Sequence, residues 1–167
     1  MYGDGRSETL VGEAIAGQRD AVFLVSKVYP HNASLRAMPA ACAASLKRLK
    51  TDRLDLYLLH WPGAVPLGET VEAFASLQRS GKIRHWGVSN FDTETMRQLW
   101  SAPGGTSAQV NQVLYNLSRR GIQMDRAPRA TVDVALFNRA GDLALRLGHD
   151  QAAPHLGRRR RRHLGVL

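Results

Sequence analysis

Several short apolar runs in this chain each end in a polar residue that can do chemistry. These ends are Lys27, His60, the pair Ser89-Asn90, and Gln112. The first three are spaced by about 30 residues, which corresponds to one βα unit each time. Strongly apolar strands are typical of parallel sheets that are covered on both faces. Reactive residues at the carboxyl ends of such strands are how a (β/α)8 barrel builds an active site, so the pattern favours an enzyme.

Segments with helical spacing of apolar residues lie between the expected strands. One begins after Ser7, a candidate N-cap, and ends at Gly17. The alternation of helix and strand predicts the α/β class with a parallel sheet. The expected strands are 22–26, 55–59, 84–88 and 108–113, and the further expected helices are 39–49, 69–79 and 93–100.

The length of the chain limits how much of a barrel it can form. It has 167 residues, whereas a complete barrel takes about 250. We therefore predict a partial (β/α)8 barrel that lacks the first strands and the C-terminal units. The two edges of such a sheet would be open, which would allow self-association.

The composition changes sharply near residue 121. The net charge of the chain is +9, and residues 121–167 hold 9 Arg and 4 Asp but no Lys, Glu, Trp or Tyr. We divide the chain into an incomplete barrel, 1–122, and a divergent basic tail, 123–167, that we expect to be poorly ordered. Within the tail, 132–136 has the pattern of a strand and 141–147 that of a helix.

Three interpretations of the tail stay open. The run Arg158–Arg162 is compatible with a nucleic-acid patch, but it has no aromatic residues between the arginines, which makes this the least favoured of the three. A solvated segment fits the same charge run. A composition rich in Arg, Ala, Gly, Pro and His without Lys is also typical of a shifted reading frame in a GC-rich gene.

Composition and the absence of targeting signals limit the class of protein. Apolar residues make up 44% and charged residues 22%, as in ordinary globular domains. No run approaches the roughly 18 apolar residues of a membrane span, and the start has no signal-peptide pattern, so we expect a cytoplasmic protein without a membrane partner.

Cys42 shares a helical face with Leu46 and Leu49, which predicts a buried thiol. No metal site is predicted, and no G-x-G-x-x-G motif supports a Rossmann fold.

A series of short segments, in order and at characteristic spacing, carries a resemblance to a known family. These segments are Tyr2-Gly3 with Ser7-Glu8, then 22–27, 45–49, 55–62, 81–84, 87–91 and 111–113. On these segments, residues 1 to about 122 resemble the aldo-keto reductases, and the details look most like bacterial members that reduce methylglyoxal and similar small carbonyls. This resemblance implies NADPH-dependent reduction of aldehydes or ketones, with NADH left open as the cofactor.

The resemblance also implies roles for particular residues. The family works through Asp, Tyr, Lys and His; Tyr2, Lys27 and His60 match the last three, and the sequence begins too close to Tyr2 to include the aspartate. A phenol has a pKa of about 10, and the Lys27 ammonium beside Tyr2 would lower it and make Tyr2 a better proton donor. A neutral His60 would orient the carbonyl by donating a hydrogen bond to its oxygen.

The remaining matched positions imply a cofactor and substrate site. Ser89, Asn90 and Gln112 match positions that bind the nicotinamide carboxamide, and Tyr29 and Trp61 would form apolar walls of the carbonyl pocket. Ser89-Asn90 could instead cap the following helix. At the level of function, the alternative is an inactive fragment or pseudoenzyme of the same family that binds the cofactor weakly.

Overall fold

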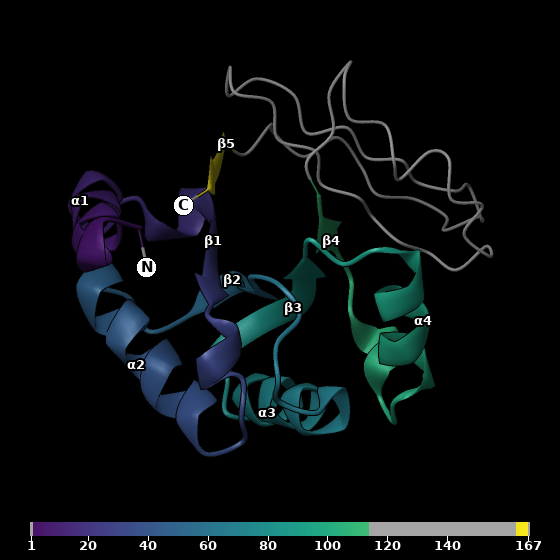
Figure 1. The fold of residues 1–167 in the computed structure, drawn as a ribbon. Helices are drawn as coiled ribbons and strands as arrows, with labels where there is room; N and C mark the ends of the chain where they lie inside the picture. The colour runs from purple at the N-terminus through teal and green to yellow at the C-terminus, as the bar shows by residue number, and fades with distance from the viewer. Residues whose placement is uncertain (1, 114–162, 167) are drawn as a thin grey trace.

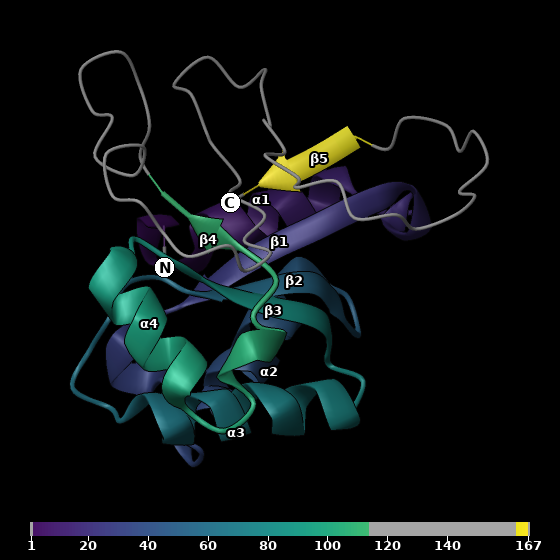
Figure 2. The same ribbon diagram turned by 90° about the vertical axis from the view of Figure 1, so that its right-hand side faces the viewer.

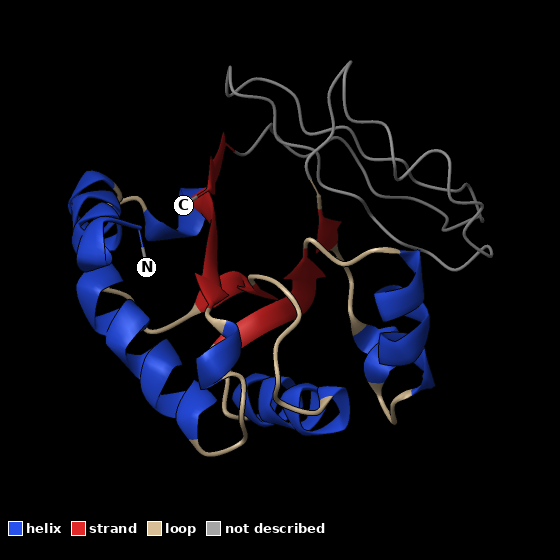
Figure 3. Cartoon of the chain, in the orientation of Figure 1, coloured by secondary structure: helices blue, strands red, loops and turns tan. Residues whose placement is uncertain are grey.

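The computed structural model describes residues 2–113 and 163–166 of the chain. Its strands form one parallel sheet in the order β4-β3-β2-β1-β5. Figure 1 shows this sheet as a curved arc with the α-helices along its outer side, and Figure 3 shows the alternation of helix and strand along the chain. The strands are β1 Val22–Val28, β2 Leu54–Leu59, β3 Ile83–Ser89, β4 Asn111–Gln112 and β5 His163–Val166.

The helices alternate with the first four strands, as the sequence predicts for the α/β class. Figure 2 shows α3 and α4 below the sheet in a view from the side. Within the described residues, no helix is long and apolar enough to cross a membrane. The α-helices are α1 Arg6–Ala14, α2 Ala37–Leu49, α3 Leu67–Arg79 and α4 Thr93–Ser101. The 3-10 turns are η1 Tyr2–Gly5, η2 Arg19–Ala21, η3 Pro30–Asn32 and η4 Gly105–Ser107.

The predicted helix cap at Ser7 is wrong, and the alternative of a cap at Ser89-Asn90 is excluded. Helix α1 begins at Arg6 after Gly5, which has a left-handed φ of 89° and provides no side-chain cap, so Ser7 is inside the first turn. Helix α4 is capped by Asp92, whose carboxylate accepts the backbone N–H of Thr95 at 2.8 Å. The pair at the end of β3 is therefore not the cap of the following helix.

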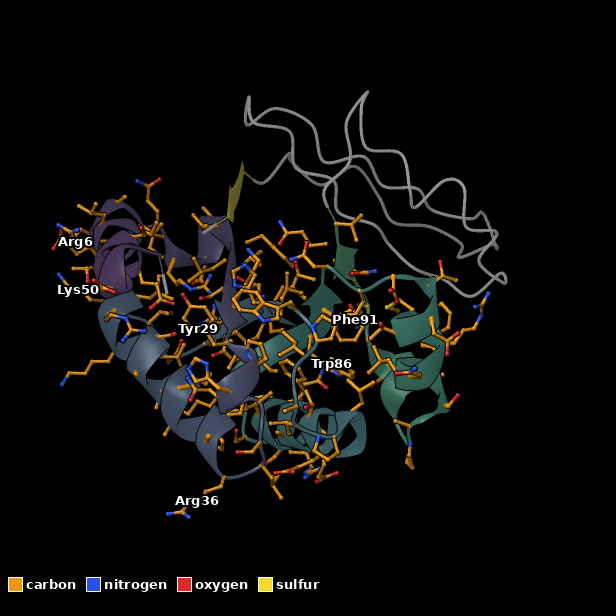
Figure 4. All side chains as sticks on the ribbon, viewed as in Figure 1. Arg6, Tyr29, Arg36, Lys50, Trp86 and Phe91 are labelled. Atoms are coloured by element: carbon orange, nitrogen blue, oxygen red, sulfur yellow. The ribbon has the colours of Figure 1, made fainter. Side chains whose placement is uncertain are left out.

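The two faces of the sheet carry separate apolar clusters, because successive side chains of a strand point to opposite faces. The outer cluster joins strand residues to α2, α3 and α4, and within it Trp86 stacks on Phe74 at 4.8 Å. The inner cluster is smaller and has Val25, Leu56 and Leu58 as its buried members. Figure 4 shows Trp86 between the sheet and the helices. Most of the described core therefore lies outside the arc.

The buried cysteine predicted from the sequence is confirmed. Cys42 is fully buried in the outer cluster together with Leu46 and Leu49. Burial raises the pKa of its thiol to about 11, because a thiolate is poorly solvated there. Cys42 is thus a packing residue.

Asp55 joins three strands at the amino end of the sheet. Its carboxylate lies 2.9 Å from an Arg19 nitrogen and 3.0 Å from an Arg84 nitrogen, and it accepts the backbone N–H of Leu24 at 2.9 Å. The carboxylate is buried, with 3% of the side chain exposed. This ion-pair cluster ties η2, β1 and β3 to β2.

Strand β5 is not expected from the sequence. It pairs in parallel with β1, with Val22 opposite His163 and Val25 opposite Val166, along an edge that we expected to be open. Such an edge presents unpaired backbone N–H and C=O groups, which any extended segment can satisfy. The strand expected at 132–136, the helix at 141–147 and the run Arg158–Arg162 lie outside the described residues.

Candidate functional site

The predicted strand-end residues lie at one end of the sheet. Lys27 is the next-to-last residue of β1, His60 follows β2, and Gln112 ends β4. Ser89 ends β3 and Asn90 follows it. Because all these strands are parallel, their carboxyl ends meet at the same edge. Their roles stay predictions, but their common location follows from the strand order.

Hydrogen bonds join the ends of β2, β3 and β4. The Asn90 side-chain amide donates to the backbone carbonyl of His60 at 2.9 Å and to the Ser89 hydroxyl at 3.2 Å. The Ser89 hydroxyl donates to the backbone carbonyl of Gln112 at 2.8 Å, and the Asn90 N–H donates to the same oxygen at 2.9 Å. Asn90 has a left-handed φ of 60°, which asparagine tolerates better than most residues. The strand-end backbone is therefore held by its own polar side chains.

The charge of Lys27 acts on His60. Lys27 is 8% exposed, and burial lowers the pKa of its ammonium. Burial, and then the charge of Lys27, lower the pKa of His60 below its ordinary value of 6.5. His60 is therefore neutral near pH 7, with one ring N–H able to donate.

A titration of His60 tests this arrangement. We expect an NMR titration midpoint below 6.5, and a higher midpoint in Lys27→Met, because removing a nearby positive charge favours the imidazolium. Folding stability linked to His60 is present above pH 6.5 and is lost as the pH falls toward the folded-state pKa. Lys82→Met is the control, since Lys82 precedes the amino end of β3. Equal midpoints in the wild type and Lys27→Met would contradict the coupling.

Aromatic rings surround His60. The Trp61 ring lies 4.4 Å from the His60 ring, and Tyr29 lies 6.0 Å from His60 and 5.6 Å from Trp61 between ring centroids. His31 stacks on Tyr29 at 5.2 Å. Trp61 is 40% exposed, so the cluster offers apolar ring surface to a ligand. The structure thus brings the two predicted pocket residues together beside His60.

Gln112 has an unsatisfied polar atom. Its side-chain oxygen is buried and has no hydrogen-bond partner among the described residues. A buried acceptor without a donor costs folding free energy. An N–H group of a bound ligand would remove this cost by donating to the Gln112 oxygen. A carboxamide group carries such donors, and the residues present therefore fit the nicotinamide end of the expected cofactor. Within the described residues, no group of three or more His, Cys, Asp and Glu could hold a metal ion.

Sequence reasoning missed two buried polar residues near the site. Asn111 is 2% exposed, and its amide donates to the Phe91 carbonyl at 2.8 Å, which holds the loop after β3. Glu8 is 3% exposed and accepts the Ser26 hydroxyl at 2.7 Å. Its helical spacing to Val11 and Ile15, both packed on the core, is a signal that could have revealed it. The side chain of Tyr2 lies outside the described part of the structure.

Sequence comparisons identify relatives of the chain. The aldo/keto reductase family matches residues 1–135. The chain is 56% identical over 128 residues to the methylglyoxal reductase YeaE of Escherichia coli K12, covering 77% of this chain and 45% of that protein. It is 45% identical over 140 residues to the aldo-keto reductase YhdN of Bacillus subtilis, covering 77% and 41%. The chain thus spans less than half the length of these relatives.

Comparison with solved structures identifies members of the same family. An aldo/keto reductase from Klebsiella pneumoniae in complex with NADP and acetate is 55% identical, with a TM-score of 0.78 and coverage of 80% of this chain and 48% of that one. An aldo-keto reductase from the same organism in complex with NADPH is 52% identical, with a TM-score of 0.81 and coverage of 85% and 52%. The partial-barrel fold is confirmed, and the chain belongs to the aldo/keto reductase family.

Proposed function

We propose that this chain binds NADPH and takes part in the reduction of small aldehydes or ketones. The observation that carries the proposal is the set of polar strand ends at one edge of the sheet, formed by Lys27, His60, Ser89, Asn90 and Gln112. The relatives support the reaction and the cofactor, since one is named a methylglyoxal reductase and another was solved with NADPH.

The cofactor end of the site would be held by β3 and β4. The buried side-chain oxygen of Gln112 would accept from the carboxamide of the nicotinamide, while Ser89 and Asn90 line the neighbouring strand end. Hydrogen bonds there fix which face of the ring meets the substrate. When bound, NADPH supplies the hydride that reduces the carbonyl carbon.

Other residues of the site would donate the proton and stabilise the negative charge that develops on the carbonyl oxygen. Tyr2, by its motif position, is the proton donor, and the Lys27 ammonium would favour its phenolate and lower its pKa. His60, whose pKa lies below its ordinary value, would donate a hydrogen bond from its neutral ring to the carbonyl oxygen. Tyr29 and Trp61 would form the walls beside the substrate.

A fluorescence titration of the full chain with NADPH tests the proposal. We expect saturable binding, weakened in Gln112→Ala by roughly three- to tenfold, as for the loss of one or two neutral hydrogen bonds. Gln109→Ala is the matched control, because Gln109 is an exposed glutamine three positions before β4's last residue. Equal weakening in both variants would contradict the assigned role of Gln112.

Turnover distinguishes the proposed reductase from the pseudoenzyme alternative. For the reductase, the full chain oxidises NADPH faster when methylglyoxal is added than without it. Saturable NADPH binding without any carbonyl-dependent oxidation would favour the pseudoenzyme. Absence of both binding and oxidation would overturn the proposed function.

A further inference from the structure

The turn that carries Tyr2 has an unusual backbone. Gly3, Asp4 and Gly5 follow Tyr2 directly and all have left-handed φ, at 55°, 54° and 89°. A non-glycine residue such as Asp4 is uncommon in this region, and such conformations persist only where the surroundings hold them. The neighbours of η1 therefore decide where this turn lies.

Arg48 on α2 lies directly against this turn. A Cβ atom placed on Gly5 would be 2.6 Å from the Cδ and 2.8 Å from the Nε of Arg48, so only a glycine allows this approach. The Arg48 side chain is 35% exposed. The part of the Arg48 side chain around Cδ and Nε therefore occupies the space beside the turn.

Glu8 connects Arg48 to the strand that carries Lys27. The Arg48 Nε and a second guanidinium nitrogen each lie 2.6 Å from one Glu8 carboxylate oxygen. The other carboxylate oxygen accepts the Ser26 hydroxyl at 2.7 Å, and Ser26 precedes Lys27 in β1. Burial would raise the pKa of Glu8, but hydrogen bonds from Ser26, Arg48 and Ser45 and the charge of Arg48 outweigh it and lower the pKa. One buried carboxylate thus contacts both Ser26 of β1 and Arg48, which lies against the turn.

We infer that Glu8 and Arg48 are positioning residues that fix the turn bearing Tyr2 against the strand bearing Lys27. This inference rests on the proposed function, in which Tyr2 donates the proton and Lys27 assists it. A buried ion pair adds little net stability compared with apolar packing, but its directional hydrogen bonds define a geometry that apolar contacts do not. In the proposed function, neither residue is assigned a contact with the substrate or the reacting atoms.

The ionisation of Tyr2 reports this geometry independently of turnover. The full chain is labelled with carbon-13 at tyrosine Cζ, and Tyr2→Phe assigns the Tyr2 signal in an NMR pH titration. We expect Tyr2 to titrate below the ordinary tyrosine pKa of about 10. In Glu8→Gln and Arg48→Met the midpoint should rise by about one pH unit toward that value, because the ammonium of Lys27 is no longer held beside the phenol. Arg48→Lys, which keeps the charge, should give a smaller rise.

A matched control lies on the same two helices. Glu13 on α1 and Lys50 after α2 form an ion pair at 3.6 Å with both side chains more than half exposed, so Glu13→Gln and Lys50→Met should leave the Tyr2 midpoint unchanged. Circular dichroism checks that each variant is folded; if Glu8→Gln does not fold, Ser26→Ala removes one contact of Glu8 and takes its place.

The outcomes separate the inference from the proposed function. A low Tyr2 midpoint in the wild type that stays unchanged in the folded Glu8, Arg48 or Ser26 variants overturns the positioning role but leaves the proposed proton donor intact. A Tyr2 midpoint near 10 in the wild type overturns the proton-donor role and the inference with it. A midpoint that rises equally in the Glu13 and Lys50 controls also overturns the inference.

Discussion

Gly105→Ala should lower the free energy of unfolding by more than about 4 kcal/mol. Gly105 opens η4, which connects α4 to β4. A Cβ atom at this position would lie 1.7 Å from the backbone carbonyl oxygen of Leu99, and Leu99 is itself fully buried in the outer cluster. Because the clash is with backbone and not with a flexible side chain, either α4 or η4 must shift to relieve it.

Urea denaturation of the full chain measures this effect, with Gly68→Ala as the control. A Cβ at Gly68, in the first turn of α3, meets nothing within 4 Å, and alanine favours a helix by up to about 1 kcal/mol over glycine. Gly68→Ala should therefore leave the midpoint unchanged or raise it. The same midpoint for both variants would show that the α4–η4 connection is not as tightly packed as described.

Asp55→Ala should cost about 3–5 kcal/mol of folding stability, the range for removing one partner of a buried ion pair. Arg19, whose side chain is 17% exposed, would lose its carboxylate, and the buried Leu24 N–H would lose its acceptor. Arg84 should contribute less to the loss, because 49% of its side chain is exposed to water. The same urea denaturation measures the change.

Asp52→Ala provides the comparison for Asp55. Asp52 also pairs with an arginine, Arg53, at 3.1 Å, but its side chain is 78% exposed, and exposed pairs contribute at most about 1 kcal/mol. Asp55→Asn keeps an acceptor for Leu24 and should be less damaging than Asp55→Ala. If Asp52→Ala and Asp55→Ala lowered the free energy of unfolding equally, burial of the Asp55 carboxylate would not explain its contribution.

The sheet and the location of the site could be predicted because both depend on local patterns. Apolar runs followed by Lys27, His60 and Gln112 indicate strands with polar ends, and parallel pairing brings those ends together. The Glu8–Arg48–Ser26 contacts could not be predicted in the same way. They join three segments that are distant in sequence, and their meeting depends on how α1 and α2 pack on β1.

Backbone conformation limited the prediction elsewhere. Ser7 has the chemistry of a helix cap, but the left-handed residues before Arg6 start the helix earlier. Strand β5 could not be predicted because its pairing with β1 uses backbone groups. Every residue except proline carries both a backbone N–H and a C=O, so residues 163–166 need no distinctive side-chain pattern to form this strand.

The outer position of the main core has a consequence for folding kinetics. The cluster between sheet and helices is assembled from successive strand–helix neighbours, from Leu24 in β1 to Leu99 in α4. Each parallel pairing in this sheet closes a loop that contains a whole helix, which slows folding compared with local contacts. Lys27 and His60 would therefore meet only once α2, which lies between β1 and β2, has docked on the sheet.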